Sequence, residues 1–155
     1  MTELKKVSDE SDQSYSNFMK NSFDMADNVG TTAEQIIRST ADWKRLGKSF
    51  EESQKLAQQS TMLMNVSEFQ NISDATDAMV SATQAYEEVA SEDIIDKLNH
   101  VGNNFAVGTS ELASGLQNAA AVLKTQGNDI DQALALLTTG SLIARKYGNI
   151  FLEYI

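Results

Sequence analysis

The chain has 155 residues, no proline, no cysteine, one histidine and a formal net charge of −10 at pH 7. The lack of cysteine excludes disulfides, thiolate nucleophiles and cysteine-ligated metal centres, and a single histidine excludes sites that need two imidazoles. The acidic balance argues against electrostatic binding to nucleic acid, and the absence of proline favours a mostly helical chain.

The N-terminal residues 1–13 are polar and lack periodicity, so we expect a frayed tail there. They contain no apolar segment of the kind that a signal peptide carries. The most apolar stretch, residues 133–144, is interrupted by threonine, glycine and serine and is shorter than the ~20 residues that cross a bilayer. The sequence therefore predicts no stable membrane span.

Three helices are predicted in the first part of the chain. Apolar residues recur at helical spacing over residues 14–29, and Gly30 is placed to end that helix. A second helix begins at Thr31 or Thr32, each followed three residues later by Glu or Gln as in a capping box, and a third begins at Ser49. The expected core residues of these helices include Tyr15, Phe18, Met19, Ser22, Met25, Ala26, Ile36, Ile37, Thr40, Trp43, Phe50, Leu56 and Leu63.

The second part of the chain predicts four more helices. Residues 65–72 are expected to form a loop with a single helical turn, and Ser73 is expected to cap a helix with the clearest apolar stripe of the chain. Further helices are expected to begin at Ser91, at Gly108-Thr109 and at Asn128. Their expected core residues include Ala75, Ala78, Met79, Ala82, Tyr86, Ile94, Ile95, Leu98, Leu112, Leu116, Ala120, Leu123, Ile130, Ala133, Leu134 and Leu137. The whole pattern predicts an all-α fold, a compact bundle of six to seven short helices with short connections.

Charge is unevenly distributed along the chain. Eight acidic residues and no lysine or arginine lie between residues 56 and 96, whereas Arg38, Lys44, Arg45 and Lys48 lie just before. A solvated acidic face is the simpler interpretation. The alternative is a self-complementary surface, on which the basic stretch of one copy meets the acidic face of another.

The residue patterns that could carry chemistry all have simpler explanations. Residues 87–88 and 92–93 are adjacent acid pairs, but neighbours in a helix do not face each other. His100 lacks a second ligand nearby, and we expect it to be partly exposed or to lie at a helix end. Residues 128–131 lack the glycine and glutamate of an EF-hand loop, so helix capping explains them. The GNNFAVG segment at 102–108 follows a helix and lacks the P-loop lysine. We therefore expect no catalytic, cofactor-binding or metal-binding residues.

Five short motifs occur in order along the middle of the chain. They are ADWKRLG at 41–47, MNVSEF at 64–69, ISDATD at 72–77, VGNNFAV at 101–107 and ELASGLQ at 111–117. Together they resemble the core region of phage tail tape measure proteins, of the type found in siphophages and prophages of Gram-positive bacteria. The resemblance covers roughly residues 30–140.

This resemblance implies a non-enzymatic structural protein of the phage tail. Members of that family are long, mostly helical chains inside the tail tube, and their length sets the tail length while tube subunits polymerise around them. The implied partners are the tail tube protein, the tail assembly chaperone or other copies of the chain. The implied location is the virion tail, and the host cytoplasm during assembly. The expected organisation is then a polar tail over 1–13, a tape-measure-like core domain over 14–140 and a diverging C-terminal helix or apolar tail over 141–155.

Two features depart from the family pattern. One straight helix of this length would span only ~230 Å at 1.5 Å per residue, so we expect an excised domain or a truncated prophage remnant. After Gly140 the sequence leaves the family pattern, and we expect its apolar end, residues 148–155, to pack back on the bundle or to pair with another copy. Because a globular bundle fits poorly in a narrow tube, we also hypothesise that the bundle is a form adopted before assembly or after ejection.

Two other functions remain open at this point. The first is a free-standing helical interaction module derived from a prophage remnant and acting on phage or host proteins. The second is an envelope-degrading enzyme domain, since some tape measure proteins carry such domains elsewhere. The lack of a facing acid pair or of a histidine or cysteine site counts against the second.

Overall fold

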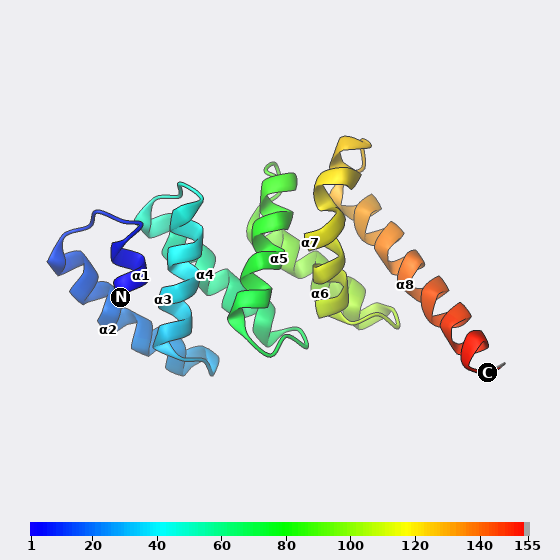
Figure 1. The fold of residues 1–155 in the computed structure, drawn as a ribbon, viewed down its shortest axis with the longest axis horizontal. Coiled ribbons are helices and arrows are strands. Elements are labelled where there is room, and N and C mark those ends of the chain that lie inside the picture. The colour runs from blue at the N-terminus through cyan, green and yellow to red at the C-terminus, as the bar shows by residue number, and fades with distance from the viewer. Residues whose placement is uncertain (154–155) are drawn as a thin grey trace. The chain divides into compact units, whose positions relative to one another are not determined.

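The computed structural model describes residues 1–153, without the side chains of Val29 and of residues 148–153, and it confirms the all-α prediction. Eight helices form over the described residues, one more than the upper expected number, and none of these residues forms a strand (Figure 1). The helices are α1 (Thr2–Lys5), α2 (Asp12–Val29), α3 (Ala33–Arg45), α4 (Phe50–Asn65), α5 (Ile72–Ala85), α6 (Ser91–Asn104), α7 (Thr109–Thr125) and α8 (Ile130–Glu153). They divide into two compact units, Met1–Val80 and Ser81–Ile155.

Side-chain caps define where most of the helices begin. Thr32 forms the predicted capping box with Gln35, and Ser49 accepts a hydrogen bond from the backbone N–H of Glu52, as expected. Two predicted caps are wrong by one or two residues. The α5 cap is Asn71, whose Oδ1 accepts from the Asp74 N–H at 3.0 Å, and the α8 cap is Asp129, not their neighbours Ser73 and Asn128. In both cases a buried isoleucine occupies the first helical position, so the cap must precede it.

The N-terminal segment expected to be a frayed tail is instead attached to the first unit. Residues 2–5 form α1, and Leu4 is fully buried. The hydroxyl of Tyr15 in α2 donates to the backbone carbonyl of Ser8, which ties the intervening loop to the helix. In the sequence, only the apolar residues Leu4 and Val7, three positions apart, indicate a helix here. Two residues are too few for a periodic pattern to be distinguished from chance.

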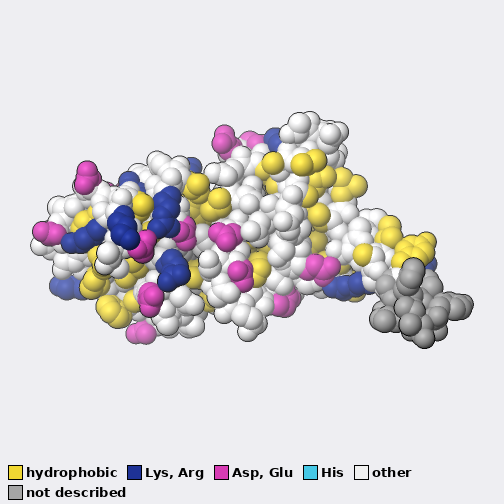
Figure 2. Space-filling view, in the orientation of Figure 1, with side chains coloured by type: hydrophobic (Ala, Val, Ile, Leu, Met, Phe, Trp, Pro, Cys, Tyr) yellow, Lys and Arg dark blue, Asp and Glu magenta, His cyan; other side chains and the backbone are white. Residues whose placement is uncertain are grey.

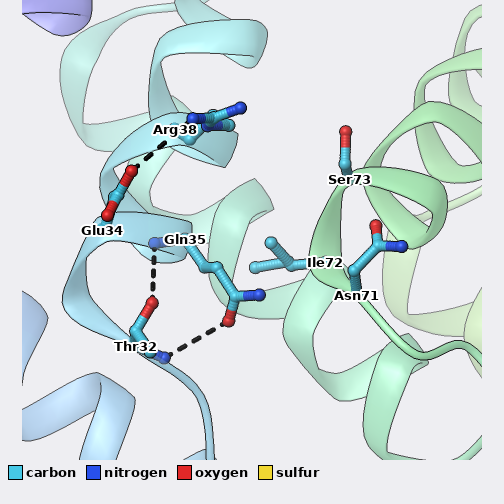
Figure 3. A pocket seen from close by; sticks show the side chains of 7 residues that line it. All are labelled: Thr32, Glu34, Gln35, Arg38, Asn71, Ile72 and Ser73. Atoms are coloured by element: carbon cyan, nitrogen blue, oxygen red, sulfur yellow. Dashed lines mark hydrogen bonds and ion pairs between the residues drawn. The ribbon is translucent and has the colours of Figure 1, made fainter.

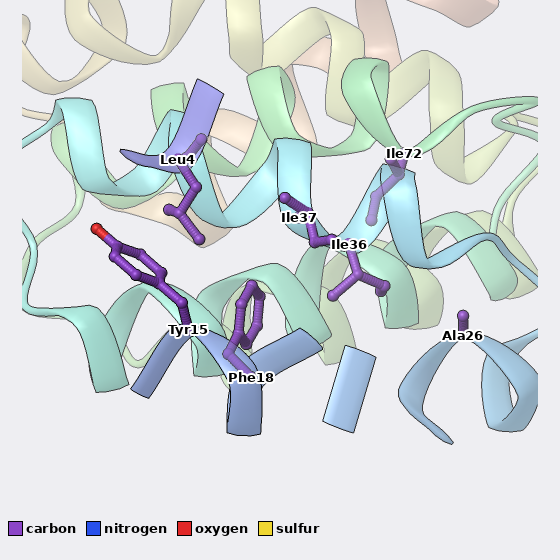
Figure 4. Packing of buried hydrophobic residues seen from close by; sticks show 8 residues of the cluster. Leu4, Tyr15, Phe18, Ala26, Ile36, Ile37 and Ile72 are labelled. Carbon is purple, nitrogen blue, oxygen red and sulfur yellow. The ribbon is translucent and has the colours of Figure 1, made fainter. Parts of the chain in front are cut away.

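The core of the first unit combines aliphatic and aromatic side chains. The ring of Phe50 packs edge-on against Tyr15 and Phe18, with ring centroids 6.0 and 5.3 Å apart. On the other side Trp43 is almost fully buried, and its Nε1 donates to Ser60 Oγ at 3.2 Å, which joins α3 to α4. The members of the hydrophobic cluster of this unit, most of which are labelled in Figure 4, are Leu4, Tyr15, Phe18, Ala26, Ile36, Ile37, Ala41 and Ile72.

The second unit packs α6, α7 and α8 against one another in all three pairs. Close helix approach is visible at two glycines. A Cβ at Gly102 would lie 2.2 Å from Thr109 Oγ1, and a Cβ at Gly115 would lie 3.0 Å from a methyl group of Leu137. Small residues at these two contacts let the neighbouring elements approach closely. The buried residues of this unit include Ile94, Ile95, Leu98, Leu112, Leu116, Ile130, Ala133 and Leu134.

The helix order also reveals an internal repeat. The buried pair Ile36-Ile37 in α3 corresponds to Ile94-Ile95 in α6, 58 positions later, and Ile72 at the start of α5 corresponds to Ile130 at the start of α8 with the same offset. Between them, buried Leu56 in α4 corresponds to Leu116 in α7, 60 positions later. The three-helix segment α3–α5 is therefore repeated as α6–α8.

Candidate functional site

The structure places the two adjacent acid pairs on either side of the start of α6. Glu87 and Glu88 lie exposed in the turn after α5, and Glu88 is bound by the ammonium group of Lys124. The hydrogen bond from Lys124 holds the pKa of Glu88 below its ordinary value, which suits a structural ion pair rather than a proton donor. Glu92 and Asp93 lie in the first turn of α6, where negative charge favours the helix dipole.

Tyr86 is the most deeply buried ionisable side chain beside this ion pair. Its ring is covered by Lys124, with the Nζ atom 5.2 Å from the ring centroid, and its hydroxyl has no hydrogen-bond partner among the described residues. Burial raises the pKa of this hydroxyl, so it stays protonated. The arrangement anchors the turn between α5 and α6 by packing and offers no activated nucleophile.

His100 and residues 128–131 take the structural roles that the simpler interpretation predicted. His100 is exposed near the end of α6, and its backbone carbonyl accepts a hydrogen bond from Asn104 Nδ2 at 2.7 Å. Asp129 and Gln132 form a reciprocal cap, while Asp131 pairs with Lys97 at 2.6 Å. Among the side chains that the structure describes, no group of three or more histidine or acidic residues could hold a metal ion.

A pocket of about 400 Å³ lies in the first unit, where the N-terminal turns of α3 and α5 approach each other (Figure 3). Its polar atoms are already used locally. Thr32 and Gln35 cap α3, and Arg38 pairs with Glu34 at 3.5 Å on the exposed surface. Asn71 caps α5 on the other wall. The pocket therefore presents helix caps to solvent, with no buried polar group directed into it.

The carboxyl group of Asp77 in α5 interacts electrostatically with Asp42 in α3, which the sequence does not predict because the two residues lie in different helices. Burial, followed by the nearby charges of Asp42 and Asp74, raises the pKa of Asp77 above its ordinary value of 3.8. Folding therefore favours the protonated form of Asp77. The stability that this shift adds to the folded protein is fully present below pH 3.8. It is lost as the pH rises through the raised pKa of Asp77.

Replacing Asp77 with asparagine is therefore expected to stabilise the protein at pH 7, by about 0.2–0.5 kcal/mol for a solvent-screened group. Below pH 3 the variant and the parent protein should have equal stability, because both carry a neutral side chain there. Urea unfolding at the two pH values measures the difference. The change Asp24→Asn, at an exposed site on α2, is the matched control. A variant that is less stable at pH 7 would contradict this assignment.

The basic stretch around α3 is largely matched by acids of its own unit. Arg45 binds both Asp42 and Glu3, and Lys48 pairs with Glu52 at 3.1 Å. Figure 2 shows lysine and arginine side chains interspersed with acidic ones on this part of the surface. These pairs leave less unpaired positive charge for a second copy than the sequence suggested.

The comparison with protein families decides the class of protein. The family model described as phage-related minor tail protein matches residues 20–146, which is most of the chain. The chain belongs to the phage-related minor tail protein family. No solved structure matches the chain.

Membership of this family supports a structural role in the phage tail and contacts with other tail proteins. It agrees with the tail-protein part of the resemblance found in the sequence. Over the described residues, no helix is long and apolar enough to cross a membrane.

Proposed function

We propose that the chain is a non-enzymatic segment of a tail tape measure protein, involved in tail assembly and in setting tail length. The observation that carries this proposal is the order of the five motifs between residues 41 and 117, all within the 20–146 region that matches the tail family. The helical structure supports the proposal, because an α-helix converts residue number into length at a fixed 1.5 Å per residue.

The proposal also specifies partners and a location. The segment would contact the tail tube protein and the tail assembly chaperone in the host cytoplasm during assembly, and it would then reside in the virion tail. The capped helices and buried cores favour a bundle that forms before assembly or after ejection. Density for an intact bundle inside an assembled tail would contradict that part of the proposal.

Tail length gives a direct test of the measuring role. In a phage whose tail gene contains this segment, deletion of residues 33–90 removes one repeat and joins the Thr32 cap to the start of α6. Because a helix rises 1.5 Å per residue, tails should be shorter by about 90 Å. Electron microscopy of purified virions measures the change, and duplication of the same residues should lengthen the tails equally.

A point substitution at an exposed site provides the control for tail length. Glu51→Gln, in the first turn of α4, changes neither the residue number nor the core, so tail length should be unchanged. Tails of normal length in the deletion phage would show that this segment does not contribute to measurement.

A free-standing interaction module is the alternative function. The observation that favours it is that each of the two units has its own set of fully buried side chains. The genomic neighbourhood separates the two functions, because adjacent tail-tube and tail-tip genes would favour assembly. Release of soluble peptidoglycan fragments, lost on substitution of one carboxylate, would instead indicate an envelope-degrading enzyme.

The boundaries at residues 13 and 140 are retained as part of the proposal. The second boundary falls within the continuous helix α8, so limited proteolysis should test it by cleavage near Gly140. The apolar end at 148–155 lies outside the residues whose side chains the structure describes. Its proposed role in packing or pairing is tested by deleting these residues, which should change the melting temperature or the oligomeric state.

A further inference from the structure

The turn between α5 and α6 lacks the residues that usually end one helix and begin the next. Residues 86–90 (YEEVA) contain no glycine, no proline and no residue with positive φ. By contrast, a glycine with positive φ follows each of α2, α3 and α7. The N-cap of α6 is Ala90, which has no side-chain acceptor for the first N–H groups of the helix. The local sequence therefore does not explain why the helix breaks here.

The apolar pattern of the sequence also continues into this turn. Met79, Ala82, Tyr86 and Val89 follow one another at the 3-4-3 spacing of one helix face. Glutamate and alanine, which are good helix formers, occupy three of the five turn positions. A continuous helix through residues 86–90 is therefore compatible with the sequence, and the observed turn requires another cause.

Contacts with α7 supply that cause. Tyr86 is fully buried, and the ammonium group of Lys124 in α7 lies 5.2 Å from the centroid of its ring. The same ammonium group forms an ion pair with Glu88. In a continuous helix, side chains two positions apart point about 200° away from each other around the axis, so one lysine cannot hold both. These two contacts, here termed the Lys124 latch, therefore form only when residues 86–88 adopt the turn.

The turn conformation also carries a cost. The buried hydroxyl of Tyr86 has no hydrogen-bond partner among the described residues, and burial of an unpaired hydroxyl destabilises the conformation that contains it. The break also deprives the first N–H groups of α6 of the intrahelical acceptors that a continuous helix would provide. Each conformation of this segment thus has its own support, the turn from the latch and the helix from backbone hydrogen bonds and local sequence.

We propose that residues 86–90 are a conformational switch controlled by the Lys124 latch. While the latch is closed, these residues form the observed turn. When the latch opens, they become helical and join α5 to α6 as one helix over residues 72–104, about 50 Å long. This inference is independent of the proposed function, because it follows from the turn and from its contacts with α7.

Substitution of Tyr86 tests whether the latch or the local sequence sets the turn. Tyr86→Ala removes the buried ring. Val89→Ala is the matched control, because tyrosine and valine have similar helix propensities and the control leaves the latch intact. The Cα secondary chemical shifts of residues 86–90, measured by nuclear magnetic resonance, should move to helical values in Tyr86→Ala and keep the parent values in Val89→Ala. Parent values in a folded Tyr86→Ala variant, or equal helical shifts in both variants, would overturn the proposal.

Lys124→Ala is the second variant, because it keeps the tyrosine ring and removes only the ammonium contacts. The secondary shifts of residues 86–90 should then lie between the parent values and helical values. The shifts of α6, α7 and α8 report whether the second unit stays folded in each variant. If Tyr86→Ala unfolds this unit, Lys124→Ala decides the question, and parent values at residues 86–90 in that variant would contradict the switch.

Discussion

Replacement of Trp43 with alanine should lower the free energy of unfolding by about 3–5 kcal/mol, the usual cost of removing a large buried aromatic side chain. Trp43 is 1% exposed and fills the contact between α3 and α4. Its indole Nε1 also donates to Ser60 Oγ at 3.2 Å, so the change removes both apolar contacts and a buried hydrogen bond. Urea unfolding followed by far-ultraviolet circular dichroism measures the loss.

Two smaller changes separate the hydrogen bond from the packing. Ser60→Ala leaves the buried Nε1 without its acceptor and should cost about 1–3 kcal/mol. Trp43→Phe removes donor and ring volume together, so its cost should fall between those of Ser60→Ala and Trp43→Ala. The control Leu46→Ala, at a 40% exposed site just after α3, should change stability by less than about 1 kcal/mol. If Trp43→Ala costs no more than this control, the contact with Ser60 does not support the first unit.

The role of Trp43 was predictable from sequence because the signal is local. Trp43 follows Ile36, Ile37 and Thr40 at helical spacing, and each of these side chains is buried in the structure. The Thr32 and Ser49 caps were predictable for the same reason, since a cap and the N–H group that it binds lie within one helical turn. Periodicity and capping together account for the all-α class and for most helix bounds.

Features that depend on contacts between distant segments were not predictable in this way. The charge of Asp42 in α3 raises the pKa of Asp77 in α5, although the two residues are 35 positions apart in the chain. Leu4 is buried only because α1 packs on α3, and four residues are too few for a periodic pattern. The internal repeat is different, because the isoleucine pairs at 36–37 and 94–95 were readable and required only a comparison of the two halves.

For the functional assignment too, contiguous motifs were readable from the sequence, whereas features that depend on the fold were not. The motifs that resemble tape measure proteins are contiguous strings, and the family match over residues 20–146 supports the tail class that they indicated. The exposed apolar side chains of α8 were not predictable from the sequence, because they alternate with the buried face of the same helix. Only the exposed fractions distinguish Leu136 and Ile143 from the core residues Leu134 and Thr138.

Gly102→Ala should destabilise the second unit by about 1–3 kcal/mol, even though alanine is the better helix former. A Cβ at Gly102 in α6 would lie 2.2 Å from Thr109 Oγ1, and also 3.1 Å from the Thr109 backbone nitrogen and 3.2 Å from its Cα. Rotation of the threonine could relieve the first contact only, because the backbone contacts are fixed by the start of α7. Thermal unfolding followed by circular dichroism measures the effect.

The same substitution at Gly140 is the matched control, because a Cβ there meets no heavy atom within 4 Å. Gly140→Ala should stabilise α8 by about 0.5–1 kcal/mol. Combining Gly102→Ala with Thr109→Ala should recover part of the loss, since the shortest contact is removed while the backbone contacts remain. If both glycine substitutions stabilise the protein, the approach of α6 to the start of α7 does not limit the side chain at residue 102. If only Gly102→Ala destabilises it, the close packing of these two elements requires a glycine at that position.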